Sequence, residues 1–131
     1  MILNRAKSIY SDEYFISKDI IFELGLMYLR VNEKWRECEK DTRSINFPDM
    51  IDSKGNKIFA SLNPNGNGGD LCRYIKGHLM YDEPGVVCKF IDGAIYFIDL
   101  NDDKFRGVIS KDWANKFEVL SILEIQEWIL N

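Results

Sequence analysis

The stretch "VVCKFIDGAIYFIDL", residues 86–100, limits the possible folds more than any other part of the sequence. Asp92-Gly93 suits a two-residue type I′ turn, in which both central residues need positive φ. This turn pairs Ile91 with Ala94, and the register then continues outward to Val87 opposite Ile98. Both faces of the hairpin are largely apolar, as is typical of central strands. A second turn at 101–104 leads to a strand at 105–110, so we predict an antiparallel meander around residues 86–110.

A second long pattern, "SKDIIFELGLMYLRVNEKWREC" at residues 17–38, predicts a long N-terminal helix. Ser17 can cap its N-terminus, with Asp19 in the first turn. Gly25 costs such a helix up to about 1 kcal/mol relative to alanine, which indicates close packing there. The apolar residues that follow helical spacing over five turns are Ile20, Leu24, Met27, Tyr28, Val31, Trp35 and Cys38.

An Asn/Gly-rich loop, "LNPNGNGG" at residues 62–69, comes directly before Asp70. The loop has glycines like those of a phosphate-binding loop, but Asp70-Leu71-Cys72 follows in place of the lysine and hydroxyl that such a loop needs. We therefore expect a mobile connection rather than a nucleotide site. Asp70 can cap a helix that places Leu71, Tyr74, Ile75 and Leu79 on one face.

The C-terminal residues allow helix and strand assignments side by side. Ser110 can cap a short helix that carries Trp113 and Phe117, and residues 117–120 can form a strand. The spacing of Ser121 and Glu124 is that of a capping box, which predicts a short final helix. The fold class expected is α+β: one antiparallel sheet packed against the long N-terminal helix and a short C-terminal helix. At 131 residues, the chain 1–131 fits a single globular domain.

No motif in the sequence predicts catalysis, and we expect the protein not to be an enzyme. Cys72 and His78 are a possible nucleophile and base, but six residues of helix rotate them by roughly 240° net, onto different sides. Asp99, Asn101 and Asp103 resemble the start of a calcium loop, but the glycine and the final acid are missing. One His and three scattered Cys have no zinc-ligand spacing, so we expect neither a metal nor a cofactor.

The charge distribution indicates the kind of partner. The net charge is −4, and the excess lies in residues 58–131, with seven Lys/Arg against eleven Asp/Glu. An acidic surface repels nucleic acid and anionic membranes and attracts basic proteins. The N-terminus has no continuous apolar signal segment, no apolar run is long enough to cross a bilayer, and the three cysteines form no recognisable framework. These features predict a cytoplasmic protein.

The candidate partner-binding residues are acidic and aromatic side chains in and beside the predicted meander. Negative charge steers the encounter with a basic protein, and a few aromatic rings supply the anchoring area. The residues that this hypothesis names are Asp82, Glu83, Asp92, Tyr96, Asp99, Asp102, Asp103 and Trp113.

In size, acidity, lack of catalytic motifs and Ala-poor, Ile/Asn/Lys-rich usage, the chain resembles bacterial toxin immunity proteins, including those of contact-dependent growth inhibition systems. The resemblance is one of overall profile and carries over no residue role. It implies a stoichiometric inhibitor that occludes the active site of a basic toxin domain, possibly a nuclease. Two alternatives stay open at this point: a small-molecule-binding domain lined by Tyr28, Trp35, Cys72 and His78, and a homo-oligomeric accessory protein that uses the meander as its interface. The sequence leaves the oligomeric state open.

Overall fold

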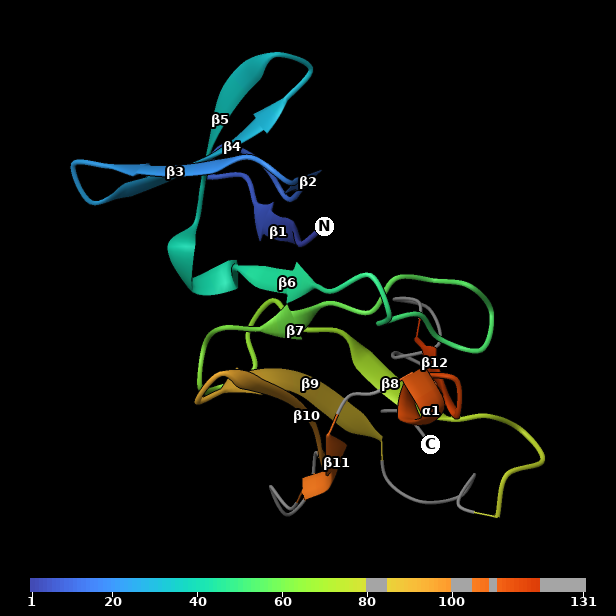
Figure 1. Cartoon of the computed structure of the whole chain (residues 1–131). Coiled ribbons are helices and arrows are strands. Elements are labelled where there is room, and N and C mark those ends of the chain that lie inside the picture. The colour runs from blue at the N-terminus through green and yellow to red at the C-terminus, as the bar shows by residue number, and fades with distance from the viewer. Residues whose placement is uncertain (80–84, 100–104, 109–110, 121–131) are drawn as a thin grey trace.

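The computed structural model describes residues 1–79, 85–99, 105–108 and 111–120, and these are mostly β (Figure 1). The larger of two sheets has nine strands, in the order β11-β10-β9-β7-β6-β1-β2, and β8 joins it between β9 and β12. Its neighbours are antiparallel except for β7 and β9, which run parallel. The strands are β1 (Leu3–Lys7), β2 (Tyr14–Ser17), β6 (Ser44–Asn46), β7 (Ala60–Ser61), β8 (Leu71–Tyr74), β9 (Val86–Ile91), β10 (Ala94–Asp99), β11 (Phe105–Val108) and β12 (Phe117–Val119).

The predicted meander is confirmed as β9, β10 and β11. β9 and β10 pair in the predicted register, from Ile91 opposite Ala94 to Val87 opposite Ile98. Asp92 and Gly93 form the turn with φ of 50° and 85°, as a type I′ turn requires. The register between β10 and β11 shifts between Phe97 and Ile98, which marks an irregularity on that edge.

The predicted long helix at 17–38 is wrong, and the α+β class is wrong with it. These residues end β2 and then form a separate three-stranded antiparallel sheet of β3 (Ile20–Glu23), β4 (Leu26–Val31) and β5 (Lys34–Cys38). Two-residue turns with positive φ connect the strands: Leu24-Gly25 at 52° and 79°, and Asn32-Glu33 at 52° and 65°. Four backbone positions in this region of φ interrupt a helix, so the segment folds as two hairpins.

Burial along β4 has the period of a strand. Met27 and Leu29 are fully buried, whereas Leu26 and Arg30 are exposed. Alternate side chains of a strand point to opposite faces, so one face of this sheet is covered and the other is open. The apolar residues at 17–38 are dense enough to satisfy a helical period and a strand period together, and the two turns decide between them.

The helix predicted after Asp70 is also wrong, because Leu71–Tyr74 is strand β8. The helices among the described residues are a 3-10 turn, η1 (Lys40–Thr42), and a single turn, α1 (Lys111–Ala114). α1 carries Trp113 as predicted, and the strand predicted at 117–120 is confirmed as β12. The predicted final helix lies outside the described residues.

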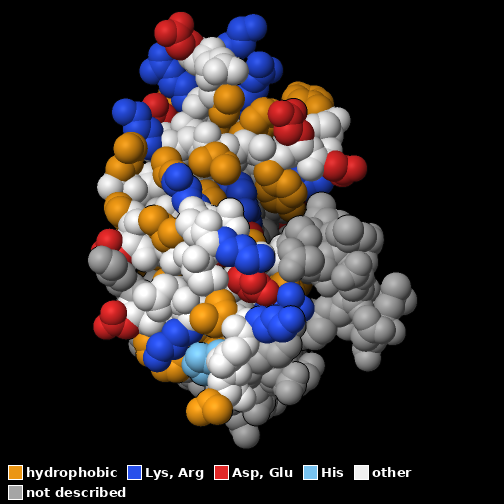
Figure 2. All heavy atoms as spheres, turned by 90° about the vertical axis from the view of Figure 1, so that its right-hand side faces the viewer, with side chains coloured by type: hydrophobic (Ala, Val, Ile, Leu, Met, Phe, Trp, Pro, Cys, Tyr) orange, Lys and Arg blue, Asp and Glu red, His pale blue; other side chains and the backbone are white. Residues whose placement is uncertain are grey.

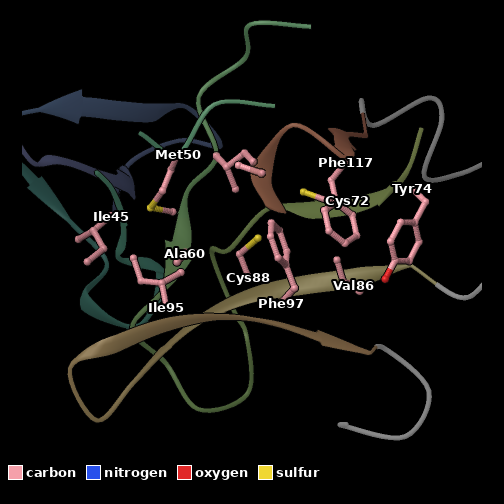
Figure 3. Packing of buried hydrophobic residues seen from close by; sticks show 12 residues of the cluster. Ile45, Met50, Ala60, Cys72, Tyr74, Val86, Cys88, Ile95, Phe97 and Phe117 are labelled. Carbon is pink, nitrogen blue, oxygen red and sulfur yellow. The ribbon is translucent and has the colours of Figure 1, made fainter. Parts of the chain in front are cut away.

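Two apolar clusters lie inside the described part of the chain. The larger is built mainly from β8, β9, β10 and β12, and the Phe117 ring lies between two other rings in it, with its centroid 4.2 Å from that of Phe97 and 4.4 Å from that of Tyr74 (Figure 3). The smaller joins Ala6 of β1 to Met27, Leu29 and Cys38 of the three-stranded sheet. The small sheet therefore packs its covered face on the β1 end of the large one.

Candidate functional site

The structure disperses the predicted partner-binding residues that it describes. Asp92 is exposed at the β9–β10 turn, and Asp99, at the other end of β10, is only 1% exposed. Tyr96 is half-buried. Trp113 packs on the large cluster, 6.3 Å from the ring of Phe117. Asp82, Glu83, Asp102 and Asp103 lie outside the described residues.

The Asn/Gly-rich loop packs into a fork of the large sheet. One part of β9 pairs with β8 and the next with β7, and the loop's glycines lie between these branches. A Cβ on Gly69 would lie 2.6 Å from the Cys88 carbonyl oxygen, and one on Gly68 would collide with the backbone of Thr42. These glycines provide room for close backbone packing, so the loop is a structural joint and not the mobile connection expected.

Asp70 does not cap a helix but closes this joint. Its carboxylate accepts a hydrogen bond from the Phe59 backbone N–H at 2.9 Å and one from the Arg5 guanidinium at 2.8 Å. Arg5 also donates to the Gly68 carbonyl at 2.9 Å, and its guanidinium lies 4.4 Å from the Phe59 ring centroid. Asp70, which stands where a phosphate-binding loop would need a basic residue, thus links β1 to the fork through Arg5.

The structure does not bring Cys72 and His78 into a catalytic arrangement. Cys72 is fully buried, and a hydrogen bond with the Cys88 thiol, together with burial, raises the pKa of the Cys72 thiol well above its ordinary value. Such a thiol is a poor nucleophile. His78 stacks on Tyr74 with ring centroids 4.9 Å apart. Tyr28 and Trp35, the other residues of the pocket considered above, belong to the small sheet.

The described residues contain no group of three or more His, Cys, Asp or Glu that could hold a metal ion. No helix within the described ranges has the length and apolarity to cross a membrane.

The open face of the three-stranded sheet is the most distinctive surface of the described chain. In the observed registers, Ile21 lies opposite Tyr28, Leu26 opposite Glu23, and Tyr28 opposite Glu37. The exposed fractions of the large apolar side chains on this face are 36% for Ile21, 41% for Leu26 and 42% for Trp35. We call this surface the outer face; its side chains are those of Asp19, Ile21, Glu23, Leu26, Tyr28, Arg30, Trp35 and Glu37.

The charged side chains of the outer face are three acids and one base. Arg30 lies over the Trp35 ring, with its guanidinium 6.0 Å from the ring centroid. Within the described ranges, no ion pair engages Asp19, Glu23 or Glu37, so these carboxylates are available to pair with cations outside the chain. The outer face therefore combines aromatic and aliphatic area with an acidic border.

The tip of the β4–β5 hairpin has a net positive charge, because two basic side chains of β5 lie beside the single acid of the turn, Glu33. Lys34 and Arg36 are exposed and lie opposite Val31 and Leu29, which places them on the covered side of the sheet, beyond its packed part. Figure 2 shows Lys and Arg side chains gathered at the top of the molecule, where Figure 1 places this hairpin. Charge therefore changes sign between the outer face and the tip of the hairpin.

Sequence reasoning missed the outer face because a helical interpretation assigned Tyr28 and Trp35 to a buried stripe. The signals that could have revealed it are Gly25 and Asn32, because glycine and asparagine readily adopt the positive φ of two-residue hairpin turns.

Comparison with known protein families, with curated proteins and with solved structures finds no match to this chain.

Proposed function

We propose that this chain is a cytoplasmic protein-binding module that inhibits a basic protein partner by stoichiometric binding, in the manner of an immunity protein against a toxin domain. The observation that carries the proposal is the outer face, an apolar and aromatic surface bordered by unpaired carboxylates. All exposed large apolar side chains among the described residues lie within residues 1–35, except Ile51 and Leu79. Three of them, Ile21, Leu26 and Trp35, lie together on the outer face, and exposed apolar side chains that cluster inside a polar rim mark an interaction site.

The composition of the outer face fits the anatomy of a binding hot spot. Trp, Tyr and Arg are the residue types that most often dominate binding energy, and Trp35, Tyr28 and Arg30 lie together here. Truncating a central tryptophan of this kind costs about 2–4 kcal/mol, which is roughly a 30- to 1,000-fold loss of affinity.

The charges of the small sheet favour a basic partner in one orientation. Asp19, Glu23 and Glu37 attract Lys and Arg of the partner, and the exposed Lys34 and Arg36 repel the same groups from the hairpin tip. A partner with a basic substrate groove would place that groove over the carboxylates, which then occupy the positions of substrate phosphates. Nucleic acid and anionic membrane are not the partners of such a face.

Of the acidic residues proposed from the sequence, Asp92 stays a candidate contact at the β9–β10 turn, because it is exposed. Asp99 leaves the surface because it is buried. The apolar side chains of the meander are already buried within the single chain, so they offer little area for a subunit interface. These side chains are Val86, Val87, Cys88, Ile95, Phe97 and Ile98.

The test is co-expression with the products of neighbouring genes in the native host. We expect one of them to be toxic and basic, the chain to restore growth, and the purified pair to form a 1:1 complex. Charge reversal by Glu23→Lys with Glu37→Lys, or truncation by Trp35→Ala, should abolish protection. Asp49→Lys, an exposed reversal outside the outer face, should leave protection intact. If the outer-face variants protect as well as the unaltered chain, the proposal is wrong.

A further inference from the structure

Strand β3 is an end strand of the small sheet and pairs only with β4 among the described residues. The Arg30 N–H donates to the Asp19 carbonyl at 3.1 Å, which makes this opposed pair a hydrogen-bonded one. Such pairs alternate along an antiparallel ladder, so Ile21 and Glu23 direct their backbone groups toward β4. Ile20 and Phe22 direct theirs away from the sheet. The outer edge of β3 thus offers backbone donors and acceptors to an added strand.

A pocket of about 380 Å³ lies beside this edge, on the covered side of the sheet. Phe22 and Met27, which lie opposite each other in the register, line it together with Leu62 and Pro64. Its other lining residues, all polar, are Lys40, Asp41, Arg43 and Asn63. Arg43 is held in place by two bonds to Asn4 Oδ1, at 3.0 and 3.1 Å, and its guanidinium lies 5.5 Å from the Phe22 ring centroid.

β3 has little of the protection that end strands usually carry. Its first three residues, Ile20, Ile21 and Phe22, are apolar, and neither lysine nor proline interrupts them. Phe22 is 56% exposed and Leu24, at the adjoining turn, 95% exposed. A free, apolar end strand is a template for pairing with another chain.

We propose that β3 binds an extended segment of a partner protein as an added antiparallel or parallel strand, and that this segment alternates basic and apolar side chains. This inference rests on the proposed function and names how the partner is held. Side chains of an added strand that point to the outer side meet Asp19 and Glu23, which favour Lys or Arg. Those that point to the other side meet the Phe22 pocket.

The pocket favours an apolar side chain over a basic one. Four of its eight lining residues, Phe22, Met27, Leu62 and Pro64, are apolar, and Lys40, Asp41 and Arg43 have a net positive charge that disfavours Lys or Arg there. Backbone hydrogen bonds would supply affinity, and the alternate side chains would set the register, as in other cases of strand addition. A shift of one residue would place basic groups in the pocket and apolar groups against the carboxylates.

The test uses the full chain and a seven-residue, acetylated and amidated peptide that alternates lysine and valine. A second peptide of the same composition, with its lysines and valines in pairs, is the control. Amide exchange followed by NMR should slow at least about tenfold at Ile20 and Phe22 when the alternating peptide is bound. The control peptide should leave both amides unchanged.

Two variants separate the edge from the side chain. Phe22→Ala and Phe22→Pro both remove the ring, and only the proline removes the outward N–H. The proline variant should bind the alternating peptide roughly fivefold more weakly than the alanine variant, as expected for one lost hydrogen bond. If Phe22→Pro unfolds the hairpin, the exchange measurement on the unaltered chain still decides.

In the peptide experiments, three results would overturn the inference: no binding of the alternating peptide, equal binding of both peptides, or protection at Tyr14 and Ile16 of β2 in place of Ile20 and Phe22. A partner that shifts the resonances of Ile21 and Trp35 without protecting the β3 amides would also overturn it, and would leave the proposed function standing. Conversely, strand addition with the alternating peptide, combined with full protection by the outer-face variants, would reject the proposed function alone.

Discussion

Replacing Gly68 with alanine should destabilise the protein far more than the same change at Gly55. Both glycines have a φ that L residues rarely adopt, +85° and +84°, so each substitution costs about 1 kcal/mol in backbone strain. At Gly55 a Cβ meets nothing within 4 Å. At Gly68 it collides with the Thr42 carbonyl oxygen and lies 2.6 Å from the Thr42 carbonyl carbon, so backbone must move.

The collision cannot be relieved locally, because both partners are held. Thr42 Oγ1 accepts from the Lys7 N–H at 2.9 Å and donates to the Glu39 carbonyl at 2.7 Å, and the Gly68 carbonyl accepts from Arg5. Overpacking of this kind costs about 1–3 kcal/mol, and a weakened Arg5 hydrogen bond adds about 1 kcal/mol. With the strain, Gly68→Ala should cost about 3–5 kcal/mol.

Urea unfolding followed by tryptophan fluorescence, with Trp35 and Trp113 as reporters, measures both variants against the unaltered chain. In thermal melts, Gly55→Ala should lower Tm by about 4 °C and Gly68→Ala by about 10–18 °C for a domain of this size. If the free energies of unfolding of Gly68→Ala and Gly55→Ala differ by less than about 1 kcal/mol, the reasoning is refuted. The loop at Gly68 would then accommodate a Cβ as easily as the exposed turn at Gly55.

Further predictions concern buried polar groups. Asp70→Ala leaves the Phe59 N–H and the Arg5 guanidinium without their acceptor and should lower the free energy of unfolding by about 2–4 kcal/mol. Asp70→Asn should lower it by roughly half as much. Equal losses for the two variants in urea unfolding would contradict a role for the charge. Asp99→Lys should cost at least about 3 kcal/mol and Asp92→Asn less than about 0.5 kcal/mol, and native thermal stability of Asp99→Lys would show that Asp99 is not buried. Burial raises the pKa of the Cys38 thiol, and the Cys88 hydrogen bond and burial raise that of Cys72, so the folded state keeps protons that the unfolded chain loses. The thiol contribution to the free energy of unfolding should therefore be complete below pH 9.0, the pKa of a thiol in the unfolded chain, and should fall above it by up to about 1.4 kcal/mol per pH unit per thiol. The fall should be less steep in Cys72→Ala. A free energy of unfolding that stays constant up to pH 11 would contradict this prediction.

The sequence predicted correctly where the turn chemistry is local and unambiguous. Asp92-Gly93 is a pair that tolerates positive φ, and the register of β9 and β10 follows from it. Leu24-Gly25 and Asn32-Glu33 adopt the same geometry with a leucine and a glutamate at positive φ, which are residues that rarely do so. The packing of Met27 and Leu29 on Ala6 of β1 stabilises those turns. This packing joins residues that are distant in the sequence, so no local pattern predicts it.

The loop at 62–69 and the candidate site escaped prediction for a related reason. Gly68 needs its small size because of Thr42, a residue 26 positions away whose proximity only the folded chain creates. Asp99 looked like a surface acid beside a turn, but it ends a central strand and is buried. Proximity that depends on strand order cannot be inferred from spacing, and the outer face depends on it as well.

The link between the two ends of the large sheet determines the order in which the strands can form. β7 has two residues, and its pairing with β9, Ser61 opposite Lys89, joins the β6-β1-β2 side to the meander. The hairpins of the small sheet and the β9–β10 hairpin close over two-residue turns, which takes microseconds, whereas the contacts of β9 with Asp70 and β7 must wait for residues roughly twenty to thirty positions away in the chain. The Cys88 N–H donates to the Asp70 carbonyl, so pulse-labelled hydrogen exchange should protect Met27 and Leu29 before Cys88. During synthesis, the strands that carry the outer face would therefore form while the meander of the large sheet is still being translated.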